Sequence, residues 1–351
     1  MSLAPYIRSL GRGPSRSRSL TCEEAQEAMK IILSGEAEPE AVGALLMLLR
    51  LRGESVEEVA GFVDAVRASL SAWHGLGAAV DWPSYAAGRT RGYPYFLLAA
   101  KLVARAGYPV LLHGWNSHQQ GIASVRNALA PLDVPLCRTR EDAQVALARH
   151  KIAYAPLEAL NPKLHELLRL RDALGLRSIV STVVRMMNPS EAEASLQGVF
   201  HPSYRKLQTD VGVQVGQRAQ AVIKGGGGEF ERHPTKAVTV SRIRNGQTFC
   251  EVAQPLIEET RRLHEGGMPS AEVLWLDPNS DAFAEAVVTG TAALALSAIK
   301  PALSFADVQD WASALWRERH TRSALPEGDH HEDLSNVSED GRPFSCYRRR
   351  R

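Results

Sequence analysis

A short apolar run near residue 110 ends in polar side chains that could bind a ligand. Residues 110–112 are apolar, and His113 and Gly114 end the run. A buried parallel strand delivers a polar group to its carboxyl end in this way, and open α/β sheets bind ligands at that edge. We therefore expect a phosphate-bearing ligand beside His113, Gly114, Asn116 and Ser117. A structural hydrogen bond at the strand end is the more common role of such a histidine.

Basic side chains gather at several other places. A loop with Gly88, Arg89 and Arg91 precedes a helix expected over residues 93–106, and it could bind phosphate through side-chain charge. Lys224 adjoins four glycines, a run that is more often a flexible turn than a phosphate loop. The two ends of the chain carry the remaining clusters, Arg8, Arg12, Arg16, Arg18 and residues 348–351. Such ends are either solvated tails or basic arms that contact phosphate.

The composition is that of a globular protein with two domains. The chain has 351 residues, and a single core stops growing at about 250 to 300 residues. No apolar run is long enough to span a bilayer, and the first residues lack a signal-peptide stretch, so we expect a cytoplasmic protein without membrane contact. The cysteines show no CxxC spacing, which argues against a zinc site and a disulfide framework.

Three amphipathic helices with clear start signals are expected before residue 75. Thr21 and Glu24 form a capping box, Pro39 suits a first helical position, and Ser55 and Glu58 repeat the box. Three short helices cannot bury all of their apolar stripes among themselves. We therefore expect a partner surface, and a homodimer formed through these helices is our preferred choice.

The second half of the chain carries further structural signals. Asn245 and Gly246 between two alternating runs predict a β-hairpin, and residues 280–299 predict a buried helix. Ser304 begins a last helix that ends near residue 319. The residues beyond 320 lack periodicity, which is typical of disorder.

The order of these landmarks resembles that of anthranilate phosphoribosyltransferase and related pyrimidine nucleoside phosphorylases. The resemblance rests on LTCEEAQEAMKIILSGE (20–36), LLMLLRLRGES (45–55) and EEVAGFVDAV (57–66), and it continues to about residue 300. It implies an α/β fold, in which a small helical domain adjoins a larger α/β domain with a central, mainly parallel sheet. The implied parts are a basic amino-terminal arm (1–19), the helical domain (20–75, completed by 156–190), the α/β domain (76–319) and a disordered tail (320–351).

The chain departs from this family where the enzymes bind diphosphate and magnesium. Most glycines of the family's GTGGDG loop are missing from residues 82–92, and Leu112 stands where the next motif has a lysine. The family's acidic pair aligns with Phe230 and Glu231, so Glu231 is only a weak metal candidate. We therefore assign no catalytic residue and no cofactor, and we expect Mg²⁺ only if the chain is an active transferase.

Basic residues occur instead around the pocket that the resemblance implies. Arg171 aligns with the position that holds the anthranilate carboxylate, although a salt bridge on the helix surface is an equal alternative. Arg177 lies in the next family motif, and Arg185 stands there in place of a proline. Further candidates for phosphate contact lie in one short segment, namely His201, Arg205 and Lys206.

This pattern resembles the YbiB-type branch of the family, which has a histidine-proline-x-tyrosine stretch like residues 201–204. The resemblance implies a dimer that lacks the tryptophan-pathway activity and binds nucleic acid, single-stranded or duplex, largely without sequence preference. An active glycosyl or phosphoribosyl transferase with an unknown acceptor is the alternative. A dimeric scaffold without a ligand is the third possibility.

Overall fold

The computed structural model describes residues 2–13, 15–85, 92–115, 121–259, 261–262, 267–277 and 281–320. The chain divides into two units, Met1–Glu318 and Arg319–Arg351, and all elements of the fold belong to the first. The segment 321–351, for which the sequence predicts disorder, lies outside the described residues.

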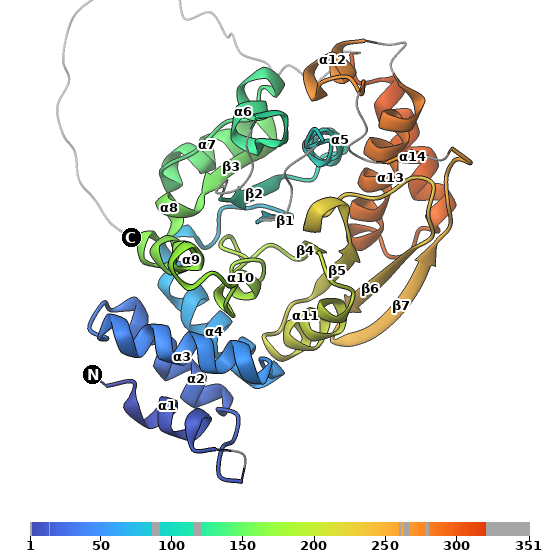
Figure 1. Cartoon of the computed structure of the whole chain (residues 1–351). Coiled ribbons are helices and arrows are strands. Elements are labelled where there is room, and N and C mark those ends of the chain that lie inside the picture. Colours follow the sequence, from blue (N-terminus) through green and yellow to red (C-terminus); the bar gives the residue numbers. More distant parts are fainter. Residues whose placement is uncertain are drawn as a thin grey trace, which may run out of the picture. The chain divides into compact units, whose positions relative to one another are not determined.

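The helices are distributed over the whole of the first unit (Figure 1). They are α1 (Ala4–Gly11), α2 (Cys22–Leu33), α3 (Pro39–Arg52), α4 (Val56–Ser69), α5 (Phe96–Arg105), α6 (Val125–Leu129), α7 (Arg140–His150), α8 (Leu157–Leu160), α9 (Pro162–Leu174), α10 (Val180–Val183), α11 (Ser203–Gln214), α12 (Ala271–Leu276), α13 (Ala282–Ile299) and α14 (Phe305–Arg317). Short 3-10 turns are found at Ser71–Trp73, Gly121–Ala123, Ala130–Leu132 and Gly226–Gly228.

The helices α2 and α4 begin at the residues that the sequence indicated. Thr21 and Ser55 each accept a hydrogen bond from the third residue of the helix, and the glutamate there bonds back to the cap. Each reciprocal cap satisfies two backbone NH groups that would otherwise lack partners. The two helices then pack closely, because a Cβ atom on Gly61 would lie 2.2 Å from the Cys22 carbonyl oxygen.

The amino-terminal segment is not the solvated basic arm that its arginines suggested. Residues Ala4–Gly11 form α1, and Leu3 and Leu10 are buried in the same core as α2 to α4. Arg18 forms an ion pair with Glu24 at 2.6 Å, while Arg8, Arg12 and Arg16 are exposed. The prediction of an unpacked arm over residues 1–19 is wrong because Leu3 and Leu10 are buried, and phosphate contact by the exposed arginines stays a prediction.

One sheet of seven strands forms the centre of the larger α/β region, in the order β3-β2-β1-β4-β5-β6-β7. The strands are β1 (Val80–Ser84), β2 (Val110–Gly114), β3 (Ile152–Pro156), β4 (Ala194–Val199), β5 (Ala219–Lys224), β6 (Val238–Arg244) and β7 (Gln247–Ala253). The first five strands are parallel, and the last two add antiparallel pairs at one edge. Asn245 and Gly246 both have positive φ and form the hairpin that the sequence predicted.

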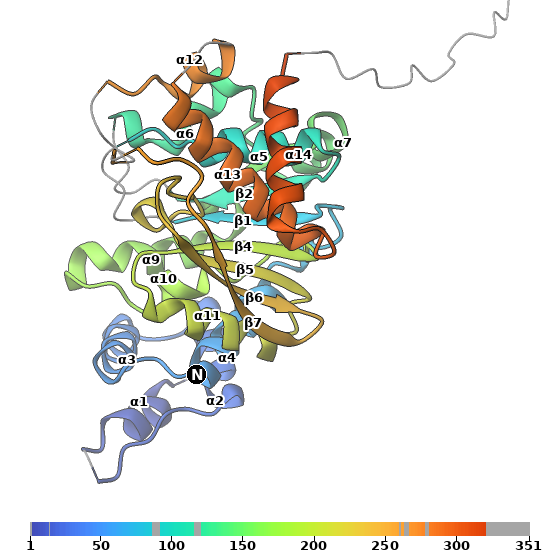
Figure 2. The same cartoon turned by 90° about the vertical axis from the view of Figure 1, so that its right-hand side faces the viewer.

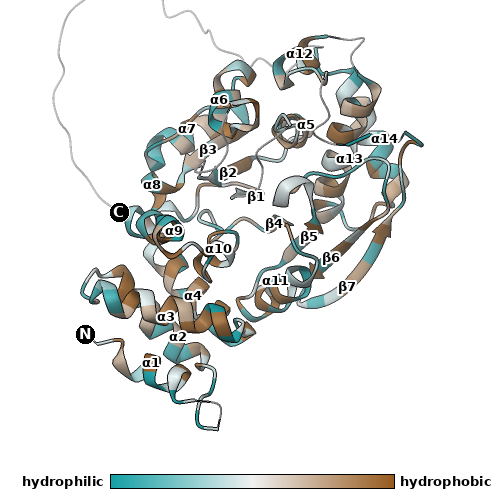
Figure 3. Ribbon diagram, viewed as in Figure 1, coloured by the Kyte–Doolittle hydropathy of each residue, from teal (hydrophilic) through white to brown (hydrophobic). Residues whose placement is uncertain are grey.

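Alternating side chains give the sheet two different faces. Trp82, Leu112 and Leu196 point to one core, which α5, α6, α12, α13 and α14 cover. Leu111 and Ala153 point to the other core, which contains the amino-terminal helices together with α7 to α11. Figure 2 shows α13 and α14, which cover the first of these cores, facing the viewer. In Figure 3 the hydrophobic stretches of α3 and α4, which belong to the second core, are brown. The expected fold, a small helical part and a mainly parallel sheet, is confirmed.

The helix α13 is the buried helix expected over residues 280–299. It is long and apolar enough to cross a membrane, but 83% of its apolar window is buried inside the protein. Its neighbour α14 begins with a further capping box at Ser304, as expected. We therefore interpret α13 as the core helix of this face of the sheet.

Candidate anion-binding site

Four arginines from different parts of the chain line one cavity of about 330 Å³. The cavity is bounded by the end of α3, the end of α9, α10 and the start of α11. Among its lining residues in the described part of the chain there is no aspartate or glutamate. Its basic and aromatic lining residues, which we call the arginine pocket, are Arg50, Arg171, Arg177, Arg185, Phe200, His201 and Tyr204.

Arg50 is a member of this pocket that sequence reasoning missed. It lies in the last turn of α3, and its Nη1 donates a hydrogen bond to the Tyr204 hydroxyl at 3.2 Å. The last turn of an exposed helix commonly carries a basic residue for reasons of helix capping alone. Its distance of 154 positions from Tyr204 in sequence leaves no local signal that the two meet.

Arg171 and Arg177 are brought together by the turn that ends α9. Gly175 ends the helix in the left-handed conformation, with φ 68°, and its NH donates to the Arg171 carbonyl oxygen. Burial lowers the pKa of Arg177, and the nearby charges of Arg171 and Arg50 lower it further. These like charges repel one another, so an anion in the pocket would relieve the repulsion.

Arg185 forms the buried floor of the pocket. Its side chain donates to the Ser181 carbonyl oxygen and, at 2.6 Å, to the Tyr85 carbonyl oxygen. Burial lowers its pKa to about 10, and the Glu229 carboxylate opposes this shift. The guanidinium is therefore still charged at neutral pH. A smaller cavity continues beyond it towards Tyr85 and Trp115.

His201 and Tyr204 line the pocket at the start of α11, whereas Arg205 and Lys206 do not. Arg205 donates to the Thr239 carbonyl oxygen at 2.9 Å. Lys206 forms an ion pair with Asp210 along the same helix at 2.6 Å. Neither residue lines the arginine pocket, because Arg205 bonds to the backbone of β6 and Lys206 pairs with Asp210, and their predicted contact with phosphate stays a prediction.

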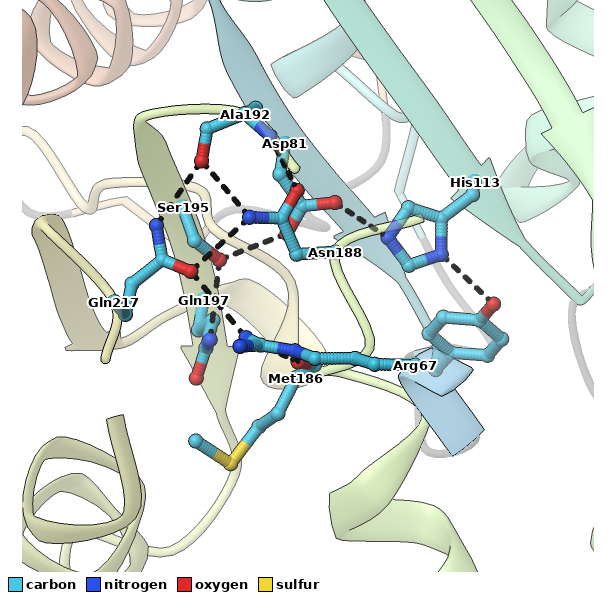
Figure 4. A network of polar contacts seen from close by, with 10 residues as sticks. Arg67, Asp81, His113, Met186, Asn188, Ala192, Ser195, Gln197 and Gln217 are labelled. Carbon is cyan, nitrogen blue, oxygen red and sulfur yellow. Dashed lines mark hydrogen bonds and ion pairs between the residues drawn. The ribbon is translucent and has the colours of Figure 1, made fainter. Parts of the chain in front are cut away.

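His113 is a structural residue and does not face a ligand. Its side chain is fully buried, with Nδ1 2.9 Å from the Tyr85 hydroxyl and Nε2 2.9 Å from an Asp81 carboxylate oxygen (Figure 4). The Ser195 hydroxyl donates to the other Asp81 oxygen at 2.8 Å. Gly114 is also structural, because a Cβ atom there would lie 2.3 Å from the Ser84 carbonyl oxygen. The predicted ligand contact of His113 is therefore wrong, while that of Gly114 stays a prediction.

The same buried network fixes the segment that carries Arg185 (Figure 4). Arg67 of α4 donates through Nε and Nη2 to the Met186 carbonyl oxygen at 3.2 and 2.9 Å, and through Nη2 to the Gln217 side chain at 3.3 Å. Asn188 has φ 39°, and its amide is bonded to the backbone of Ala192 in both directions. The arginine pocket is therefore held in place by polar contacts with both α4 and the sheet.

Glu231 is buried and acts as a helix cap. Its Oε2 accepts a hydrogen bond from the Phe96 NH at the start of α5 at 3.0 Å. Phe230 packs in the core, with its ring centroid 5.6 Å from that of Trp82. Glu229 is likewise buried, and it accepts from the Ser84 hydroxyl at 3.0 Å. The weak metal candidate is therefore corrected to a structural residue.

The glycine run after Lys224 is a compact turn. A Cβ atom on Gly225 would lie 1.7 Å from the Glu229 carbonyl oxygen, and Gly227 and Gly228 have positive φ. Lys224 itself is exposed and does not line the arginine pocket. The candidates Gly88, Arg89, Arg91, Asn116 and Ser117 lie outside the described residues.

Comparisons with known proteins agree with this arrangement. Residues 4–70 match the helical bundle domain of the glycosyl transferase family, and residues 96–316 match its a/b domain. The anthranilate phosphoribosyltransferase of Afipia carboxidovorans is 30% identical over 68% of this chain and 70% of its own length. That of Rhizobium johnstonii is 30% identical over 70% of this chain and 71% of its own.

Solved structures show the same fold. The anthranilate phosphoribosyltransferase of Thermus thermophilus has a TM-score of 0.71 at 20% identity, over 90% of this chain and 94% of its own. The Saccharomyces cerevisiae enzyme in complex with PRPP and Mg has a TM-score of 0.71 at 14% identity, over 90% and 93%. The family matches and the identity to the curated relatives together show that the chain belongs to the glycosyl transferase family, with a helical bundle domain and an a/b domain.

Proposed function

We propose that this family member binds the phosphates of nucleic acid through the arginine pocket and does not transfer a phosphoribosyl group. The observation that carries the proposal is the convergence of four guanidinium groups, from α3, α9 and the chain on either side of α10, on a cavity without a lining carboxylate in the described residues. One guanidinium group can donate hydrogen bonds to two phosphate oxygens at once, and it remains charged at every physiological pH. Contacts of this kind read the backbone and not the bases, so little sequence preference is expected.

The described residues do not fit a magnesium–diphosphate site of the kind that the yeast relative holds. Magnesium needs several oxygen ligands in near-octahedral geometry. Glu229 and Glu231 are buried, and they bond to the Ser84 hydroxyl and the Phe96 NH. Within the part of the chain that the structure describes, no group of three or more potential ligand side chains is found. The engagement of both carboxylates by protein groups supports binding without metal-assisted transfer.

The test is an anisotropy titration of labelled single-stranded and duplex DNA over a range of salt concentrations. If all four arginines neutralise phosphates, log Kd changes with log salt by about 3 for single strands, at roughly 0.7 per phosphate. The variant Arg171→Gln/Arg177→Gln should reduce that slope by about 1.4 and weaken binding to all sequences equally.

A matched control lies on the same helix. Lys163→Gln/Arg169→Gln removes two charges from α9 that do not line the pocket, so its salt slope should remain close to that of the unchanged protein. Equal loss in both variants, or binding that ignores salt, would contradict the proposal.

Phosphoribosyl transfer is the second candidate function. The curated relatives are named as anthranilate phosphoribosyltransferases, and an arginine pocket could also hold a diphosphate. Release of pyrophosphate from phosphoribosyl diphosphate with Mg²⁺, stopped by a chelator and by Arg171→Gln, would replace our proposal. We expect no such release, and we expect DNA affinity to be unchanged by the chelator.

A further inference from the structure

A second cavity lies at the amino ends of the parallel strands, whereas the arginine pocket lies at their carboxyl ends. It has a volume of about 500 Å³ and is lined by Ala79, Ala194 and Ala219, at the amino ends of β1, β4 and β5. Tyr85, at the other end of β1, belongs to the small cavity that adjoins the arginine pocket. Tyr85 lies six residue steps of extended chain beyond Ala79, which is about 20 Å at roughly 3.3 Å per residue. The two cavities are therefore separate sites.

Small side chains create this space, and the strand register shows which of them are neighbours. Ala194 pairs with Ala219, and Val80, which follows Ala79, pairs with Ala194. The methyl groups of Ala194 and Ala219 thus lie side by side at the start of two neighbouring strands, and Ala79 lines the same cavity just before β1. The end of β6 and the end of α13 close the cavity, through Arg244 and Ile299.

Four cationic side chains line the cavity, two of them on β6, against one carboxylate among its described lining residues. They are Arg218, Arg242, Arg244 and Lys300, and the carboxylate is that of Glu193. Arg242 is already neutralised, because its Nε lies 2.6 Å from a carboxylate oxygen of Glu251, which is not a lining residue. The remaining three cations exceed Glu193 by two charges. The carbonyl end of α13 contributes only part of a negative charge.

The side chains around this surplus charge are suited to an organic anion. Arg244 donates to the Pro301 carbonyl oxygen at 2.9 Å, and its guanidinium carbon lies 5.2 Å from the centroid of the Phe249 ring. The Lys300 ammonium lies 5.4 Å from the centroid of the Tyr108 ring. Both aromatic residues line the cavity. Each cation is thus held beside a flat apolar wall, while Arg218 and Lys300 are exposed and form no ion pair with a described residue.

We propose that this cavity binds a phosphorylated small molecule of about mononucleotide size, with the phosphate between Arg218, Arg244 and Lys300. Its volume of about 500 Å³ lies within the range of ligand pockets. A dianionic phosphate would match the two excess positive charges, and the base would lie against the aromatic walls. This site does not depend on the nucleic-acid function proposed for the arginine pocket.

The experiment is a calorimetric titration of the full chain with adenosine monophosphate and, separately, with inorganic phosphate at low ionic strength. Arg218→Glu/Lys300→Glu should weaken adenosine monophosphate binding by about tenfold or more, which corresponds to the loss of charge-assisted hydrogen bonds. The pocket variant Arg171→Gln/Arg177→Gln should retain this binding. A charge-matched control, Arg138→Glu/Lys236→Glu, changes two exposed residues that do not line the cavity and should also retain it.

Each result decides the proposal. Loss confined to Arg218→Glu/Lys300→Glu, with unchanged thermal unfolding, supports the site. Loss confined to Arg171→Gln/Arg177→Gln places the ligand in the arginine pocket and overturns the second site. Equal affinity for inorganic phosphate and adenosine monophosphate overturns the assignment to a nucleotide, and the absence of binding by either probe overturns the site altogether.

Discussion

At the scale of single residues, His113 shows how burial changes the meaning of a reactive side chain. From the sequence it ends a strand at the edge where ligands bind, which is why it was a candidate. In the structure both ring nitrogens have partners, and the side chain has no exposed surface. A residue that lies between Tyr85 and Asp81 in this way stabilises the fold at the point where β1 and β2 meet.

Replacing His113 by leucine should lower the free energy of unfolding by about 3 kcal/mol, because a buried carboxylate and a buried hydroxyl lose a partner. Urea denaturation measures this change. The control His150→Leu, at an exposed position on α7, should have little effect. A His113→Leu protein as stable as the unchanged one would show that the network contributes nothing.

The second prediction at this scale concerns the ion pair of Arg18 and Glu24. The hydrogen bond from Arg18 lowers the pKa of Glu24 from 4.5 to about 2. Because the folded pKa lies below the unfolded one, the stabilisation is present above about pH 4.5 and is lost as the pH falls through about 2. Carboxyl NMR titration should show the Glu24 midpoint rising in Arg18→Gln and unchanged in Arg16→Gln. A midpoint that is equal in all three proteins would refute the pair.

At the scale of elements, the sequence predicted the starts of α2, α3, α4 and α14 but not a cap supplied by a distant residue. Thr21, Ser55 and Ser304 are hydroxyl caps with a carboxylate three residues later, so the signal is local and could be read. The cap of α5 is instead Glu231, which is 135 positions away in sequence. Alignment with a metal motif therefore gave it the wrong role.

Replacing Glu231 by alanine should lower the free energy of unfolding by about 1 to 2 kcal/mol, the usual cost of a lost helix cap. The affinity for DNA should not change, because Glu231 does not line the arginine pocket. Glu141→Ala, in the exposed first turn of α7, is the control and should cost less. Weaker DNA binding in a fully folded Glu231→Ala protein would return this residue to the site.

The candidate site was predictable in part for a similar reason. Arg171, Arg177 and Arg185 lie within one stretch of sequence. Alignment with consecutive family motifs therefore predicted that they share one pocket. Arg50 comes from a different helix, and Arg205 lies outside the pocket because its side chain bonds to the backbone of β6. Charge can be read from a sequence, whereas the direction of a side chain needs the tertiary fold.

At the scale of the whole molecule, we propose that two copies associate through the amino-terminal helices. Leu51 at the end of α3 is 84% exposed, and the partly buried Met47 and Leu48 share its side of the helix. An exposed apolar stripe on a helix is stabilised when a partner covers it. Burial of each leucine of this kind contributes roughly 2 kcal/mol.

The change Leu51→Glu should therefore convert a dimer into a monomer in sedimentation velocity experiments. The control is Leu276→Glu. Leu276 is 62% exposed on α12, which packs on the other face of the sheet, so this change should leave the assembly unchanged. A monomeric unchanged protein, or a dimer that persists in Leu51→Glu, would exclude this interface.

The arginine pocket is assembled from residues on α3, at the end of α9, in the connection to α10 and just beyond α10, and no two of its arginines are adjacent in the chain. Evolution can therefore add or remove its charges one at a time. Related proteins that carry two or three of the four should grip polyanions with graded strength. Affinity for polyanions across such a lineage would then rise stepwise with the number of guanidinium groups, and no single substitution would create or abolish it.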